Sequence, residues 1–371
     1  MSTQIKESEQ MLRETIGEIG PLNACAMKLA KERQAKLAKP PGSLGKLEDI
    51  SVRLAGITGS VHNRIEKKRI IVLCADNGVT KEGVSSAPAS VTLSQAVNMT
   101  RGKTGMSCLA AEFGDEVQVV DVGIAAAYRD DHILNCRIRE GTENIRVKPA
   151  MLREEVLRAV LVGIELAGQA KREGCGVVGV GEMGIGNTTT SSAVLSVLTG
   201  RPVEEVTGRG GGLTDSALQK KCLVIREAVR LHMPDPADVI DVLTKVGGLD
   251  LAAMCGVFLG CARERIPVVI DGLISVTAAL CAARLSPQSR EFFFASHVSA
   301  EPGYRAACGQ LRLEPPLFLD MRLGEGSGCP LMFEVLRAAC TVMNDMATFE
   351  EAAINDSYLD GIRECSAEQD R

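Results

Sequence analysis

Residues 174–190 constrain the fold of this chain more than any other stretch. Residues 174–180 are small and mostly apolar, which predicts a buried strand of a parallel sheet. A glycine-rich turn with Gly184 and Gly186 follows, and Asn187 and Thr188 can cap a helix after it. A helix N-terminus behind a glycine turn binds anions, because backbone amides point outward and the helix end is partially positive. The stretch therefore predicts a bound phosphorylated small molecule.

The same stretch has a second interpretation. The spacing Gly179-x-Gly181-x-x-Gly184 matches the dinucleotide fingerprint, but this match is weak in a chain with 37 glycines. The turn also continues past Gly184 and contains Glu182, whose carboxylate would repel a pyrophosphate. An acid there suits a sugar hydroxyl or a cationic ring better. A tight connection whose glycines only allow close packing remains the structural alternative.

Composition excludes several classes of partner. The net charge is −5, and neither a basic block nor a tryptophan is present, which argues against a nucleic-acid surface. No run approaches the roughly 18 uncharged apolar residues of a membrane span, and the N-terminus lacks an apolar signal core. The 13 cysteines form no C-x-x-C pair and the four histidines are scattered. We expect a cytoplasmic protein with buried thiols, no metal site and no cofactor.

Strands and helices alternate along the chain. Besides the central strand, apolar runs predict strands at residues 69–75, 116–123, 267–272, 291–297 and 315–320. Residues 124–150 are expected to be irregular. The alternation predicts an α/β fold, namely a parallel Rossmann-like sheet with helices on both faces. In such sheets the loops at the carboxyl ends of the strands hold the ligand.

The ends of the chain predict a smaller helical domain. Two helices are expected within residues 5–38, split at Gly20-Pro21, and they have no strand partner. We expect residues 1–65 to form this domain together with C-terminal helices. The catalytic α/β domain would span residues 66–345, and residues 346–371 would form a C-terminal helix and a tail that frays from about Ser357.

A second glycine-rich loop lies at residues 207–215. Four glycines, Gly210 and Gly211 among them, and one arginine make it a candidate anion loop. Thr214 or Asp215 is expected to cap the next helix, which carries Lys221. A flexible surface loop is the alternative, but the arginine and the lysine favour phosphate or carboxylate binding.

Residues 323–328 read L-G-E-G-S-G and contain a single carboxylate, Glu325. A glutamate in apolar surroundings has a pKa raised toward neutrality, which makes it a usable general base. Arg322 is the nearest cation in the sequence and can point elsewhere. The alternative is an acid on a solvent-exposed loop.

Six motifs in order resemble one family, nicotinate-nucleotide–dimethylbenzimidazole phosphoribosyltransferase, over residues 20 to 345. Each motif alone is modest, but six in sequence are highly specific. They are K-P-P-G-S-L-G-K-L-E (39–48), residues 75–79 with 82–88, G-E-M-G-I-G-N-T-T (181–189), G-R-G-G-G-L (208–213), S-H-V-S-A-E-P-G (296–303) and L-G-E-G-S-G (323–328).

The resemblance implies a reaction. Nicotinate mononucleotide would donate its phosphoribosyl group to 5,6-dimethylbenzimidazole, giving α-ribazole 5′-phosphate and nicotinate in the assembly of cobalamin. Glu325 would remove the ring N–H proton while the other ring nitrogen attacks C1′ of the ribose, with inversion. The positive pyridinium ring makes nicotinate a good leaving group, so no metal is required. The family also implies a homodimer.

The resemblance further implies the site. Glu182 would face the ribose or stabilise the developing cation, and Ser86, Gln95 and Leu323 would line the pocket for the aromatic base. The 5′-phosphate would be held by Gly184, Gly186, Asn187, Thr188, Gly210, Gly211 and Lys221.

Two positions depart from the family pattern. Family members commonly have a histidine where Asn77 stands and another where Tyr304 stands. We expect both positions to lie near the site, so that benzimidazoles, purines and phenols are all conceivable acceptors. A phenol would change the nucleophile from nitrogen to oxygen. Two other classes stay open at this point: a non-catalytic nucleotide-binding module and a dinucleotide oxidoreductase.

Overall fold

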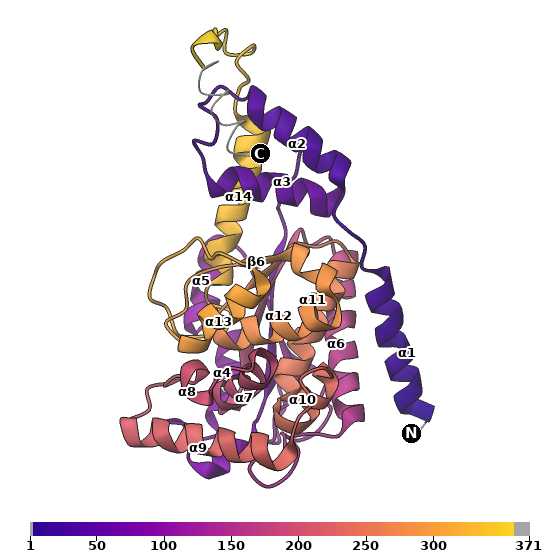
Figure 1. Cartoon of the computed structure of the whole chain (residues 1–371), viewed down its shortest axis with the longest axis vertical. Helices are drawn as coiled ribbons and strands as arrows, with labels where there is room; N and C mark the ends of the chain where they lie inside the picture. The colour runs from indigo at the N-terminus through magenta and orange to yellow at the C-terminus, as the bar shows by residue number, and fades with distance from the viewer. Residues whose placement is uncertain (1–2, 360–371) are drawn as a thin grey trace. The chain divides into compact units, whose positions relative to one another are not determined.

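A six-stranded parallel sheet forms the centre of the larger part of the chain, and Figure 1 shows the helices that surround it. The computed structural model describes residues 3–359. The strand order is β3-β2-β1-β4-β5-β6, which is the order of a doubly wound α/β sheet and confirms the predicted fold. The strands are β1 Lys68–Ala75, β2 Glu116–Gly123, β3 Ile133–Asn135, β4 Val177–Met183, β5 Val268–Ile270 and β6 Phe293–Ala295.

The order in which the chain adds strands to this sheet reverses between β1 and β4: β2 and β3 follow on one side of β1, and β4, β5 and β6 on the other. Strands β1 and β4 are buried along their whole length, as expected for the middle of a sheet covered on both faces. Cys74 pairs with Met183, so the two strands end together at one edge. The loops that leave neighbouring strands separate at this point, which opens a crevice for a ligand.

Helices occupy most of the remaining chain. They are α1 Thr3–Glu18, α2 Ala24–Lys36, α3 Lys46–Thr58, α4 Val91–Thr100, α5 Gly105–Phe113, α6 Arg153–Arg172, α7 Asn187–Thr199, α8 Val203–Val206, α9 Asp215–His232, α10 Val239–Val246, α11 Leu249–Arg263, α12 Leu273–Leu285, α13 Pro302–Leu311 and α14 Cys329–Asp345. Short 3-10 helices are η1 Gly78–Glu82, η2 Pro287–Phe292 and η3 Ser357–Leu359.

Helices α6 and α11 pack against each other closely, and α11 in turn packs on strands of the sheet. Glycines make this approach possible. A methyl group added at Gly163 of α6 would overlap the carbonyl oxygen of Ala253, and one added at Gly256 of α11 would overlap that of Val160. The two backbones therefore touch directly, and no larger residue fits at either glycine.

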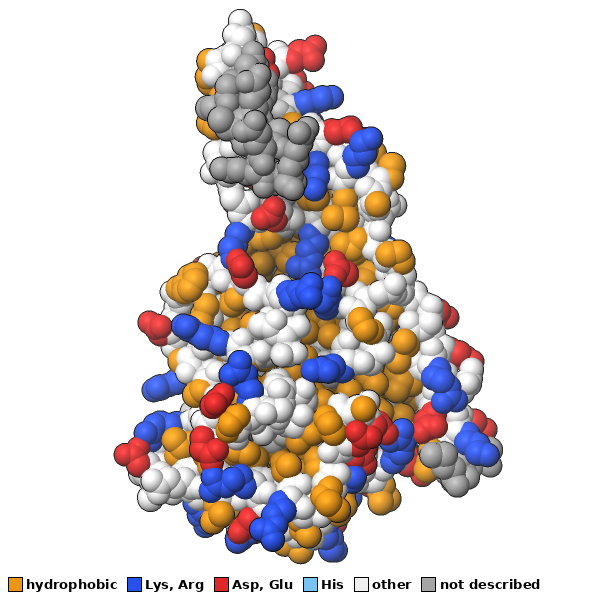
Figure 2. All heavy atoms as spheres, viewed as in Figure 1, with side chains coloured by type: hydrophobic (Ala, Val, Ile, Leu, Met, Phe, Trp, Pro, Cys, Tyr) orange, Lys and Arg blue, Asp and Glu red, His pale blue; other side chains and the backbone are white. Residues whose placement is uncertain are grey.

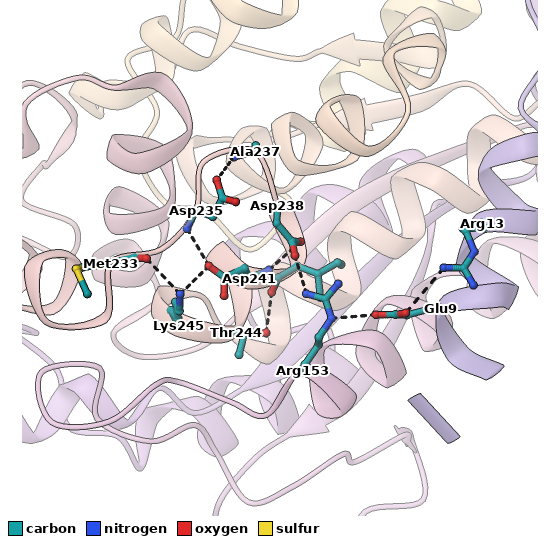
Figure 3. Close-up of polar contacts among 11 residues, drawn as sticks. Glu9, Arg13, Arg153, Met233, Asp235, Ala237, Asp238, Asp241, Thr244 and Lys245 are labelled. Carbon is teal, nitrogen blue, oxygen red and sulfur yellow. Dashed lines mark hydrogen bonds and ion pairs between the residues drawn. The ribbon is translucent and has the colours of Figure 1, made fainter. Parts of the chain in front are cut away.

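Helix α1 belongs to the same compact unit as the sheet, because it packs on α6 and α11. Figure 3 shows the polar side of this contact. Arg153 of α6 donates to Glu9 of α1 at 3.0 Å and to Asp238 at 2.8 Å. Asp238 also caps α10 by accepting from the amide of Asp241 at 3.1 Å. The expected grouping of all residues 1–65 differs from this arrangement, since α1 packs on α6 and α11 and its Glu9 pairs with Arg153.

The second compact unit consists of Pro21–Glu66 and the chain from Phe333. Ala26 and Ala30 of α2, Ala55 of α3 and Met343 of α14 form its core. The boundary therefore falls inside α14, which runs on from the sheet unit as one helix, and not at residue 345. Residues 346–359 carry only the short η3 where a C-terminal helix was expected, and residues 360–371 of the expected tail lie outside the described range.

The structure differs from the predicted secondary structure in two segments. Residues 315–320 form no strand; Leu317 makes only an isolated parallel bridge to His297. Pro315 and Pro316 have no amide hydrogen to donate to a sheet, and Asp320 has a positive φ of 51°, which turns the chain away. Within the segment expected to be irregular, residues 133–135 add β3 to the edge of the sheet.

The surface is mixed in charge. On the face drawn in Figure 2, acidic and basic side chains are interspersed among apolar ones. Within residues 3–359, the structure contains no helix that is long and apolar enough to cross a membrane.

Candidate active site

A cavity of about 220 Å³ lies at the carboxyl edge of the sheet, where β1 and β4 diverge. Loops after β1, β4, β5 and β6 contribute its walls. The sequence-predicted site residues that line it are Ser86, Gln95, Glu182, Gly184, Gly186, Asn187, Thr188, Gly210, Gly211, Leu323 and Glu325. The fold thus brings together motifs that lie up to 239 residues apart, from Ser86 to Glu325.

The N-terminus of α7 opens into this cavity. Gly186 precedes the helix with a φ of 96°, a left-handed conformation that glycine adopts without strain. No side chain caps this helix end. Asn187 and Thr188 were expected to do so, but they are the first helical residues and do not cap it. The positive end of the helix therefore faces the cavity, where it favours an anion. The amides of Asn187 and Thr189 already donate to the carbonyl oxygens of Gly184 and Gly186, at 3.0 and 2.9 Å.

The second glycine-rich loop, residues 207–215, lies beside this helix end, but side chains of the protein already use some of its hydrogen-bonding groups. The amide of Gly210 donates to Glu301 Oε1 at 3.0 Å. Arg209, a cation that favoured an anion loop, pairs instead with Asp215 and donates to the carbonyl of Leu213. Thr214 caps α9 as predicted, accepting from the amide of Ala217. An anion at this loop would have to exchange with the Glu301 carboxylate.

Lys221 does not line the cavity, contrary to the expectation. It is fully buried behind Thr188, where its Nζ donates to Thr188 Oγ1 at 2.9 Å and to the carbonyl oxygen of Gly208 at 3.0 Å. Burial lowers the pKa of Lys221 to about 8, and the nearby carboxylate of Glu301 opposes this. The lysine therefore links the two glycine-rich loops by hydrogen bonds to Thr188 and Gly208. Its positive charge lies behind Thr188 and acts on the cavity from there.

Glu182 is buried at the end of β4. Its carboxylate accepts from the side-chain amide of Asn187 and, at 3.4 Å, from the backbone amide of Glu325. Burial raises the pKa of Glu182 to about 8, and the nearby carboxylate of Asp250 adds to the rise. The raised pKa favours the protonated acid, and a cation beside it would favour its ionised form.

We expect this acid to make stability depend on pH. The folded protein holds one proton more than the unfolded chain between the ordinary glutamate pKa of about 4.5 and the folded value of about 8. Stability should therefore fall as pH rises through that window, by at most about 1.4 kcal/mol per pH unit for one proton. Glu182→Gln should flatten this slope in urea unfolding measured from pH 5 to pH 8.

A control separates this effect from simple charge removal. Glu112→Gln removes a carboxylate from the exposed surface of α5, and this variant should keep the wild-type slope. Equal slopes for wild type and Glu182→Gln would show that Glu182 is not held protonated in the folded protein.

Glu325 is buried, with 6% of its surface exposed, and its side chain faces the cavity. Its Oε1 accepts from Gln95 Nε2 at 3.4 Å and its Oε2 accepts from the amide of Met106 at 3.3 Å. Burial raises the pKa of Glu325, while the hydrogen bonds from Met106 and Thr104 oppose the rise. The predicted direction of the shift is confirmed, but the surroundings are more polar than the flanking glycines suggested, because the donors come from α4 and α5.

Sequence reasoning missed several residues of this cavity. Asp271, His297, Ser299 and Glu301 follow β5 and β6 and line its walls, as does Arg322. The available signal was their position directly after predicted strands. Asn77 and Tyr304, in contrast, are almost fully buried and absent from the cavity wall. Both nevertheless lie near the site, as expected. Asn77 lies against Gly184 and Gly186, and the ring of Tyr304 stacks on that of His297 with centroids 6.4 Å apart. Any effect of these two residues on the acceptor would therefore pass through residues of the cavity wall.

The first two glycines of the dinucleotide fingerprint do not lie in the turn where a pyrophosphate would bind. Gly179 and Gly181 lie inside β4 and not in the turn. A methyl group added at Gly181 would overlap the carbonyl oxygen of Glu325. Gly181 thus admits the loop that carries Glu325, which is a packing role and gives no support to pyrophosphate binding.

A doubly wound sheet with an uncapped helix N-terminus and buried carboxylates around one cavity is typical of α/β proteins that bind phosphorylated small molecules. Residues 19–354 match the family described as phosphoribosyltransferase. The chain belongs to the nicotinate-nucleotide–dimethylbenzimidazole phosphoribosyltransferase family. It is therefore an enzyme that transfers a phosphoribosyl group.

Individual relatives are similar over nearly the full length. A nicotinate-nucleotide–dimethylbenzimidazole phosphoribosyltransferase of Clostridium perfringens is 50% identical over 354 residues, covering 95% of this chain and 98% of the relative. One of Chloroflexus aggregans is 46% identical, covering 93% and 98%. The crystal structure of the Thermus thermophilus enzyme superposes with a TM-score of 0.86 at 37% identity and covers 91% of this chain and 100% of that one.

Proposed function

We propose that this enzyme transfers the phosphoribosyl group of nicotinate mononucleotide to 5,6-dimethylbenzimidazole or a related base, giving α-ribazole 5′-phosphate and nicotinate. One observation carries the proposal: the buried carboxylate of Glu325 and the free N-terminus of α7 face the same cavity. The helix end suits the 5′-phosphate and the carboxylate suits the N–H of the acceptor. Relatives named nicotinate-nucleotide–dimethylbenzimidazole phosphoribosyltransferase support the same substrates.

The chemistry follows from this placement. One ring nitrogen of the acceptor attacks C1′, and the bond between C1′ and the nicotinate nitrogen breaks, with its electron pair returning to the pyridine ring. Glu325 accepts the proton from the other ring nitrogen. Attack opposite the leaving group inverts C1′. Because the leaving pyridinium is already cationic, the protein mainly supplies position and charge, and Glu182 would face the positive sugar centre.

The phosphate would lie at the turn of Gly184, Gly186, Asn187 and Thr188, with Gly210 and Gly211 opposite them. The amide of Asn187 would exchange its hydrogen bond from the carbonyl of Gly184 to a phosphate oxygen. The amide of Gly210 would exchange its hydrogen bond from Glu301 to a phosphate oxygen. Ser86, Gln95 and Leu323 would enclose the flat acceptor, and Gln95 also holds the Glu325 carboxylate. This arrangement places the acceptor between the base and the sugar.

We expect Lys221→Met to weaken nicotinate mononucleotide binding without a matching loss of turnover. The variant removes the buried charge behind Thr188 and both hydrogen bonds that join the glycine loops. The KM for nicotinate mononucleotide should rise about tenfold, equivalent to about 1.4 kcal/mol, while kcat changes less. Steady-state kinetics checks this. Lys220→Met on the exposed side of α9 should behave as wild type, and an unchanged KM for Lys221→Met would show that its charge does not reach the phosphate.

We further propose that the enzyme works in the cytoplasm as a homodimer. Phe318 is 78% exposed, and Leu319 and Leu323 are exposed on the same connection. Apolar side chains gathered in this way favour an interface between proteins. Light scattering of the purified chain tests the assembly, since a monomeric mass at micromolar concentration would contradict it.

In the decisive experiment the enzyme is incubated with nicotinate mononucleotide and a panel of acceptors. The products are then identified by mass spectrometry. The panel holds 5,6-dimethylbenzimidazole, adenine and p-cresol. We expect release of nicotinate together with a phosphoribosylated benzimidazole. Hydrolysis without transfer would overturn the proposal, because water would then be the acceptor. No nicotinate release with any acceptor would overturn it in favour of a binding module. Calorimetric titration with NAD tests the oxidoreductase alternative separately.

A further inference from the structure

The loop that carries Glu325 has an unusual backbone. Gly324, Glu325 and Gly326 have successive φ values of 81°, 65° and 88°, and Glu325 has a side chain for which this conformation is unfavourable. Such a run cannot form the regular hydrogen bonds of a helix or strand. Contacts from outside the loop must therefore keep the carboxylate aimed into the cavity.

The main outside contact comes from Asp271 at the end of β5. Its Oδ2 accepts from the amide of Gly326 at 3.0 Å, and its Oδ1 accepts from the amide of Gly328 at 2.7 Å. One carboxylate thus holds the backbone directly after Glu325. Only 2% of Asp271 is exposed, so water cannot replace these bonds readily. The same amides lie just before α14, where negative charge is favourable.

Strand β4 supports the loop from the other side. The carbonyl of Glu325 lies directly against Gly181, and the amide of Glu325 donates to Glu182 at 3.4 Å. The carboxylate itself is held by Gln95 and Met106 and has no hydrogen bond to Asp271. Loss of Asp271 would therefore leave the hydrogen-bond partners of the acid in place and release its backbone. It would also remove a negative charge that lies 3.8 Å from His297 Nδ1 and raises the pKa of Glu325.

We propose that Asp271 is the positioning residue for Glu325, fixing the backbone after it so that the carboxylate stays within reach of the acceptor N–H. The inference rests on the proposed function of Glu325 as the base. Displacement of a reacting group by about 1 Å can cost about 100-fold in rate, and the loop has no second anchor of this kind after Glu325 among the described residues.

The test is a double-mutant cycle in the full-length enzyme, with Asp271→Asn, Glu325→Gln and the double variant. We expect Asp271→Asn alone to lower kcat by about 10- to 100-fold and to change the KM for nicotinate mononucleotide less than about threefold. In the Glu325→Gln background the same substitution should cause almost no further loss. A positioning role predicts this non-additivity, and a general loss of stability does not.

Asp121→Asn is the matched control. Asp121 is a buried carboxylate at the end of β2 that accepts from the amides of Gly123 at 2.9 Å and Ile124 at 2.8 Å, away from the cavity wall. Its variant should lower the unfolding temperature and leave kcat near wild type. If Asp271→Asn folds poorly, Asp271→Ser, whose hydroxyl can still accept one amide, is placed in the same cycle.

The outcomes are distinct. Equal factors for Asp271→Asn in the wild-type and Glu325→Gln backgrounds would overturn the inference, since Asp271 would then act independently of Glu325. Loss of nicotinate mononucleotide binding in both Asp271 variants would overturn it too, by assigning Asp271 to substrate binding. Full turnover in Glu325→Gln alone would instead remove the proposed base, whatever Asp271 does.

Discussion

Glu325→Gln should lower kcat by about 10²- to 10⁴-fold, the usual contribution of a general base. Glutamine has the same shape and keeps an oxygen that can accept from Gln95 or the amide of Met106, so the fold and nicotinate mononucleotide binding should persist. The wild-type profile of kcat/KM against pH should have an acid limb above the ordinary glutamate range, because burial raises the pKa of Glu325. That limb should be absent from the variant.

An acceptor without a ring N–H makes this prediction sharper. 1-Methylbenzimidazole has no proton to lose, so wild type and Glu325→Gln should transfer phosphoribose to it at similar rates. Asp320→Asn is the control, because Asp320 is exposed on the segment between α13 and α14 that also carries Glu325, and asparagine tolerates its positive φ of 51°. Wild-type turnover of dimethylbenzimidazole by Glu325→Gln would exclude Glu325 as the base.

The second large effect concerns the fold. Gly256→Ala should destabilise the protein by about 2 kcal/mol or more, since the added methyl group would overlap the Val160 carbonyl oxygen and force α6 and α11 apart. The better helix propensity of alanine, worth about 1 kcal/mol, offsets only part of this cost. A lower urea midpoint and a lower unfolding temperature should be measured.

Gly309→Ala supplies the opposite control. Gly309 is exposed within α13 and has no atom within 4 Å of an added methyl group. Its variant should be unchanged or more stable by about 0.5–1 kcal/mol. Identical unfolding of wild type and Gly256→Ala would mean that the two helices can separate without cost.

The opposite signs expected at these two glycines illustrate what sequence can and cannot tell. The stretch at residues 174–190 predicted a strand, a turn and a helix from local periodicity alone, and β4 and α7 confirm it. Local sequence did not distinguish a glycine for anion binding from one for packing. Gly181 matched the dinucleotide fingerprint, yet a glycine is needed at this position of β4 because the carbonyl of the distant Glu325 lies directly against it.

The same limit applies to charges. Lys221 was assigned to the cavity from its helix and its neighbours, whereas the structure buries it behind Thr188. Asp271 was missed, because its partners, the amides of Gly326 and Gly328, lie at sequence separations of 55 and 57. Such partners are backbone groups, which leave no pattern in a sequence.

The sequence by itself determined the alternating α/β architecture, and it located the candidate anion-binding helix end and the candidate base, because periodicity and turn chemistry are local properties. The ordered motifs also determined the family. Only the tertiary structure decided that Glu182, Asp271 and Glu325 share one buried edge and that Asn77 and Tyr304 stay off the cavity wall. Burial and pKa depend on which distant segments meet, and those meetings are set by strand order and helix packing.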